Sequence, residues 1–136
     1  MNSPKKVYYL VLPILILALA ALACGTGYTT THKLSGNSGE VRIRMNEANG
    51  TDSTSAEISE DWSRVRVTAT VTLSVDTGSC LAYVTGEDGT SINLNASAGS
   101  PGEVYGNLVT DSFGEVDLQT DCQNAQNLDL TIYFAR

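Results

Sequence analysis

The chain has 136 residues, and its 15 acidic residues outnumber its 8 basic ones, so its formal net charge is −7 at pH 7. Binding to nucleic acid needs clustered positive charge, so this composition excludes nucleic acid as an expected partner. The length suits one domain with a single hydrophobic core rather than two.

Residues 1–25 have the features of an export signal. Lys5 and Lys6 precede an apolar run over residues 7–23, and the small residues Ala21 and Ala23 occupy the third and the first position before Cys24. A basic start, an apolar core and small residues before the cut are the parts of a signal peptide. We therefore expect residues 1–23 to be a signal peptide that is removed before Cys24.

The segment Ala21-Leu22-Ala23-Cys24 resembles the lipobox of bacterial lipoproteins, although that family places a leucine where this chain has Ala21. The resemblance covers residues 1–25 and implies that Cys24 carries lipid, which would anchor the protein on the extracytoplasmic side of the cell membrane. Ordinary secretion and an uncut membrane anchor stay open as alternatives, since a membrane span needs roughly 20 apolar residues.

The three cysteines can be divided between two roles. An unpaired thiol is a liability in an exported protein, and acylation of Cys24 would leave Cys80 and Cys122 as an even pair. We therefore predict a disulfide between Cys80 and Cys122, with two buried free thiols as the alternative.

Residues 24–38 are small and polar, with a threonine run at 29–31 and the glycines Gly25, Gly27 and Gly36. Such a composition buries little surface and suits a flexible tether. We expect a tether here and a folded domain over residues 39–136, and we leave open that the tether contributes a first edge strand.

Hydrophobic residues in the domain alternate with polar ones. The longest case runs from Val65 to Val75, where every second residue is apolar, as expected for a half-buried strand. Shorter alternating runs occur at residues 41–45, 56–58, 92–96, 104–108, 116–118 and 128–134.

Turn-forming residues separate these runs. They include Asn49-Gly50, Asp76-Thr77-Gly78, residues 86–89, residues 97–102 and Asp111-Ser112-Phe113-Gly114. Short alternating strands joined by such turns predict an all-β, antiparallel β-sandwich of the jelly-roll or immunoglobulin-like type.

The sequence offers no recognisable catalytic set. A serine or cysteine nucleophile and a zinc site both need histidine, and the single histidine, His32, lies in the expected tether. We expect no enzyme and no catalytic residues, and we keep a small carboxylate-based hydrolase acting on carbohydrate as the alternative, because acidic residues are numerous.

No cofactor is expected, and calcium is kept as an alternative. Oxygen-rich loops at Glu47 with Asp52, and at Asp111 with Glu115, carry ligands of the kind that calcium takes. None of these loops has the spacing of an EF-hand, and acidic solvated turns are the simpler interpretation.

One face of the sandwich is a candidate binding surface. Strand parity places Tyr105 and Tyr133 outward, where aromatic rings can stack on sugars, while Trp62 is expected in the core or at a corner. Four arginines lie on the polar parity of two strands and would cluster for an anionic glycan or a partner's carboxylates if those strands were neighbours. The candidate residues are Arg42, Arg44, Arg64, Arg66, Tyr105 and Tyr133.

These observations predict a membrane-tethered extracytoplasmic lipoprotein whose sandwich binds a glycan or an envelope protein without catalysis. A subunit that adds an edge strand to a neighbour is the alternative within the non-catalytic class.

Overall fold

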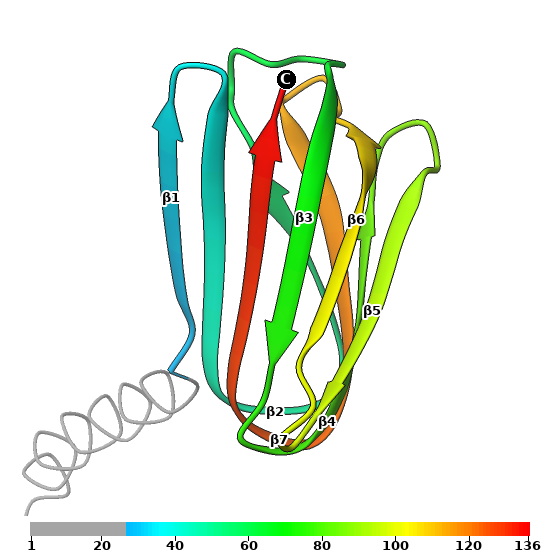
Figure 1. The fold of residues 1–136 in the computed structure, drawn as a ribbon. Coiled ribbons are helices and arrows are strands. Elements are labelled where there is room, and N and C mark those ends of the chain that lie inside the picture. The colour runs from blue at the N-terminus through cyan, green and yellow to red at the C-terminus, as the bar shows by residue number, and fades with distance from the viewer. Residues whose placement is uncertain (1–26) are drawn as a thin grey trace, which may run out of the picture.

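The computed structural model describes residues 27–136, and the signal peptide and Cys24 lie outside this range. The described chain folds into an antiparallel β-sandwich, as the alternating pattern predicted (Figure 1). Its strands are β1 (Thr29–Ser35), β2 (Ser38–Glu57), β3 (Arg66–Ser74), β4 (Thr77–Thr85), β5 (Ser91–Ser97), β6 (Gly102–Val109) and β7 (Glu115–Ala135).

Two long strands belong to both layers of the sandwich. β2 and β7 pair along most of their length, curve together at the lower end of the molecule and continue into the second layer (Figure 1). The front sheet has the order β1, first half of β2, second half of β7, β3 and β6. The back sheet has the order second half of β2, first half of β7, β4 and β5.

The core lies between the two sheets and is made by the apolar positions of the alternating runs. Val67, Val71 and Leu73 of β3 are almost fully buried, while Arg66, Thr68 and Ser74 at alternate positions are exposed. Each sheet therefore presents one apolar face to the other and one polar face to solvent.

The expected flexible tether is wrong for residues 29–35, which form the edge strand β1 that the sequence analysis left open. Every residue of β1 is exposed, so nothing in its pattern of burial distinguishes it from a tether. β1 is held instead by its backbone ladder to β2, from Thr29 opposite Arg44 to Ser35 opposite Ser38. A tight turn at Gly36 connects β1 to β2, and the φ of 61° at this position suits glycine.

The expected turn at Asn49-Gly50 is also wrong. β2 continues through these residues, and its register with β7 shifts between Ala48 and Gly50, as in a β-bulge. Gly50 has a φ of 86°, so the residue types that favour a turn here serve a bend within one strand.

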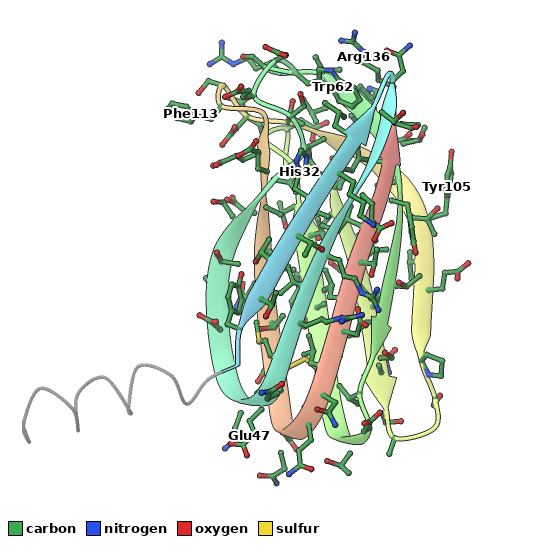
Figure 2. All side chains as sticks on the ribbon, turned by 90° about the vertical axis from the view of Figure 1, so that its left-hand side faces the viewer. His32, Glu47, Trp62, Tyr105, Phe113 and Arg136 are labelled. Atoms are coloured by element: carbon green, nitrogen blue, oxygen red, sulfur yellow. A yellow bond between two sulfur atoms is a disulfide. The ribbon has the colours of Figure 1, made fainter. Side chains whose placement is uncertain are left out.

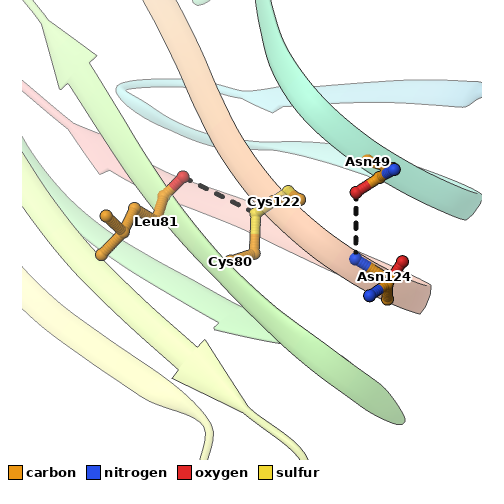
Figure 3. The surroundings of a disulfide bond; sticks show 5 residues. All are labelled: Asn49, Cys80, Leu81, Cys122 and Asn124. Carbon is orange, nitrogen blue, oxygen red and sulfur yellow. Dashed lines mark hydrogen bonds between the residues drawn. A yellow bond between two sulfur atoms is a disulfide. The ribbon is translucent and has the colours of Figure 1, made fainter.

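The predicted disulfide is confirmed. Cys80 of β4 and Cys122 of β7 are direct cross-strand partners in the back sheet and are bonded to each other (Figure 3). The bridge therefore joins two neighbouring strands whose bonded residues are 42 positions apart in the chain.

Candidate functional site

The two tyrosines of the candidate surface lie on the outer face of the front sheet, as their parity predicted. Tyr133 of β7 and Tyr105 of β6 are both direct cross-strand partners of Thr70 in the intervening strand β3. Their side chains are 48% and 67% exposed, respectively, and Tyr105 points away from the sheet in Figure 2. Two strand spacings separate their backbones by about 9.5 Å, so the row runs across the strands.

A paired arginine lies beside this row. The Arg42 Nη2 atom lies 2.5 Å from Asp129 Oδ2, and Arg42 Nε donates to Asp129 Oδ1 at 2.9 Å. The hydrogen bond from Arg42 holds the pKa of Asp129 below its usual value, and the same bond raises the pKa of Arg42. Arg44 Nε lies 3.4 Å from the same carboxylate, so both arginines share one acidic partner.

The other two arginines lie at the opposite end of the molecule. Arg64 Nε is 3.3 Å from Glu87 Oε2, and Arg66 Nη2 is 4.0 Å from Asp88 Oδ2. β7 lies between β2 and β3, so the two strands that carry the arginines are not neighbours. The expected cluster of four arginines therefore does not form, and each pair is next to an acidic side chain.

A shallow hollow of about 260 Å³ lies between Tyr133 and the paired arginine. Thr131 is at its floor and is only 5% exposed, yet its hydroxyl makes no hydrogen bond to any other described residue. Because Thr131 lines the hollow, its hydroxyl can bond water or a ligand that enters there. The hollow is lined by Arg42, Thr72, Leu73, Ser74, Pro101, Asp129, Thr131 and Tyr133.

This arrangement suits a polyhydroxylated ligand. The exposed rings offer flat apolar surface, the carboxylate of Asp129 accepts hydrogen bonds, and Arg42 donates them. We call Tyr105, Tyr133, Arg42, Asp129 and Thr131 the front-face site. Sequence reasoning missed Asp129 and Thr131, because their place beside Arg42 depends on the pairing of β2 with β7.

Trp62 is in the core, as expected. It is 3% exposed, and its ring meets that of Phe134 edge to face with 5.8 Å between centroids. The guanidinium of Arg136 lies 4.8 Å from the centre of the Trp62 ring, and both residues lie at the upper end in Figure 2. Trp62 therefore holds the 58–65 segment on the sandwich and offers no stacking platform.

His32 is not an isolated tail residue. Its Nε2 atom lies 2.7 Å from the backbone oxygen of Ile58, and its ring is parallel to that of Phe134 at 6.3 Å between centroids. These contacts attach the edge strand β1 to the segment that follows β2.

The calcium candidates lie in two separate places. Glu47 and Asp52 are near the bend of β2, whereas Asp111 and Glu115 flank a turn at the other end. Asp111 Oδ1 accepts backbone N–H groups from Phe113 at 2.8 Å and Glu115 at 3.0 Å, which stabilises that turn. Within residues 27–136, no three metal-ligating side chains come together, and calcium binding stays a prediction.

Cys24, the expected lipid attachment point, lies outside the described residues. In the part of the chain from residue 27 onward, no helix has the length and apolar character needed to span a bilayer.

No family model matches the sequence, and no curated protein does. Among solved structures, the carbohydrate-binding module of Cellvibrio mixtus lichenase 5A with cellotriose has 14% identity and a TM-score of 0.36, over 81% of this chain and 87% of that one. TmCBM61 with β-1,4-galactotriose has 10% identity and a TM-score of 0.39, over 79% and 70% of the two chains.

The chain is also similar to CapF, with 10% identity and a TM-score of 0.43 over 82% of this chain, but it spans only 29% of CapF. At such scores these likenesses say nothing of ligand or activity, and the site has to be judged from its own residues.

Proposed function

We propose that the protein is a non-catalytic glycan-binding module, tethered to the extracytoplasmic side of the cell membrane through lipid on Cys24. The observation that carries the glycan assignment is the row of Tyr133, Thr70 and Tyr105, with two exposed rings in register on one flat sheet face. Exposed rings on a sheet can instead stabilise cross-strand pairing. Here the polar residue Thr70 lies between them and a hollow lies beside Tyr133, which favours a ligand.

Charge around the row favours an uncharged glycan. Arg42 and Arg44 share Asp129, so little positive charge is left on this face to attract an anionic chain. Binding would then rest on stacking against the rings and on hydrogen bonds to sugar hydroxyls, with the glycan lying across the strands.

The test is a screen of neutral and uronic-acid oligosaccharides followed by titration calorimetry with the best neutral hexasaccharide. We expect Tyr133→Ala and Tyr105→Ala each to lower the affinity by about tenfold, equivalent to about 1.4 kcal/mol. Tyr83→Ala is the matched control, because Tyr83 lies in β4 of the back sheet. Equally strong binding in all three variants would contradict the assignment of glycan binding to the front-face site. So would the absence of binding to any neutral glycan.

The carboxylate-based hydrolase is separated from this proposal by product analysis. Mass spectrometry of the best hexasaccharide after prolonged incubation should show it intact. Shorter products that disappear with Asp129→Asn would establish catalysis instead.

The lipid anchor has its own test, which is independent of glycan binding. Mass spectrometry of the protein isolated from membranes should show an acyl mass on Cys24 as the first residue. Cys24→Ser should release the protein from the membrane fraction. An unmodified Cys24 after cleavage would establish plain secretion, and an intact leader would establish an uncut anchor.

A further inference from the structure

The bend of β2 brings polar residues to positions that normally hold core. Before the bulge at Asn49, the inward positions of β2 include Met45 and Glu47; after it, the shift in register turns Gly50 and Asp52 inward. The bulge is held by a hydrogen bond from the backbone N–H of Asn124 to Asn49 Oδ1 at 3.2 Å (Figure 3). Glu47 lies at this bend, at the lower end of the molecule in Figure 2.

These residues line a hollow of about 550 Å³. The back sheet ends at the second half of β2, whereas the front sheet continues to β1, so the hollow lies at the open edge of the sandwich. Glu47, Asp52 and Thr54 are exposed although they have inward parity. We call this hollow the edge cleft; Tyr28, Met45, Glu47, Ala48, Asn49, Gly50, Thr51, Asp52, Ser53, Thr54 and Thr120 line it.

Thr120 brings a hydroxyl group to the edge cleft. It is 4% exposed, on the inward parity of β7, and directly opposite Asp52. Its hydroxyl makes no hydrogen bond to another described residue, yet it is not sealed inside the protein. Because Thr120 lines the edge cleft, its hydroxyl can bond water or a ligand that enters there.

The lining also has a definite charge. Glu47 and Asp52 supply two carboxylates, and the residues described as lining the edge cleft include no lysine, arginine or histidine. The four ion pairs found within residues 27–136 all involve Arg42, Arg44, Arg64 or Arg66, so neither carboxylate is compensated there. The negative charge of the lining therefore repels an anionic ligand and favours a cationic one.

We propose that the edge cleft binds a protonated amino sugar. The ammonium group would meet the carboxylates of Glu47 and Asp52, and sugar hydroxyls would bond Thr120 and Thr54. The apolar face of the ring would pack against Tyr28 and Met45. This site is separate from the front-face site and does not depend on it.

The test compares two trisaccharides that differ only at the sugar nitrogen. The trimer of glucosamine carries free, protonated amino groups, and the trimer of N-acetylglucosamine carries neutral acetamides. Calorimetry at pH 6 should show at least tenfold tighter binding of the glucosamine trimer. Asp52→Asn and Thr120→Val should each weaken that binding by at least fivefold. Tyr83→Ala should leave it unchanged, because Tyr83 lies in β4 of the back sheet and does not line the edge cleft.

Asp121→Asn is the control for unspecific attraction, since Asp121 is an exposed carboxylate on the outer face of the back sheet. Equal affinity for the two trimers would overturn the proposal. So would an equal loss of affinity in Asp121→Asn and Asp52→Asn, which would indicate attraction to the overall negative charge. Circular dichroism of each variant confirms that the sandwich is intact.

Discussion

Asp129 is the residue that organises the front-face site, because it fixes Arg42 beside the tyrosine row and bonds Arg44 as well. The Asp129 side chain is 26% exposed and that of Arg42 is 38% exposed, so water screens the pair. We therefore expect the pair to add little to the free energy of unfolding.

The contribution of this pair should depend on pH. Because Arg42 lowers the pKa of Asp129, the stabilisation is present above the usual carboxyl pKa of about 4 and is lost as the pH falls through the lowered value. Urea unfolding from pH 7 to pH 2 should show wild type more stable than Asp129→Asn at pH 7, with the two converging at low pH. A constant difference across this range would show that Asp129 contributes by packing alone.

Gly114 is the position where a single methyl group should cost most. Its φ is 77°, and a Cβ atom there would lie 1.7 Å from the backbone oxygen of Ser59. Gly89 has a similar φ of 82° but nothing within 4 Å of the same position. Both alanine variants lose about 1 kcal/mol to the backbone conformation, and Gly114→Ala should lose at least about 2 kcal/mol more through the clash.

Thermal unfolding of the two variants measures this difference. The Gly114 oxygen also accepts the N–H groups of Ile58 and Ser59, so a shift there would loosen the segment that carries Trp62. Equal stability of Gly114→Ala and Gly89→Ala would contradict this account of the turn.

At the scale of elements, the bridge between β4 and β7 should stabilise the back sheet. Cys80 and Cys122 are 42 residues apart, and in the chain-entropy description a loop of this size makes the bridge worth about 4 kcal/mol. Urea unfolding of Cys80→Ala/Cys122→Ala should show a loss of about 2–4 kcal/mol with the sheet retained. A loss below about 1 kcal/mol would show that the disulfide restricts the unfolded chain much less than this description assumes.

The sequence predicted most of the strands because alternation of apolar and polar residues reports burial directly. β3 is the clearest case, since each apolar residue from Val67 to Leu73 is buried. β1 escaped this reasoning because none of its residues is buried. It is ordered by its pairing with β2 and by the contacts of His32. The turn predicted at Asn49-Gly50 was wrong because the residue types that form turns also form bulges within a strand.

The candidate site was predictable in part, for the same reason. Parity alone placed Tyr105 and Tyr133 outward, and this is confirmed. The neighbours of a residue across strands depend on strand order, which alternation does not contain. Hence the link between Arg42 and Asp129, which are 87 positions apart, and the separation of Arg42 from Arg66 emerged only from the fold.

At the scale of the whole molecule, the two layers present different outer faces. The front sheet carries the tyrosine row and the paired arginines, whereas the outer face of the back sheet carries Asp117, Asp121 and Tyr83. The edge cleft opens beside β1, away from both faces. A ligand can therefore be assigned to one of these three surfaces by locating the residues that it perturbs.

Chemical-shift mapping of backbone amides during titration with the best neutral hexasaccharide tests the central assignment most directly. Binding at the front face should shift amides of β3, β6 and the second half of β7, around Thr70, Tyr105 and Tyr133, and leave β4 and β5 unchanged. Shifts confined to the back sheet, or none with any neutral glycan, would contradict the account.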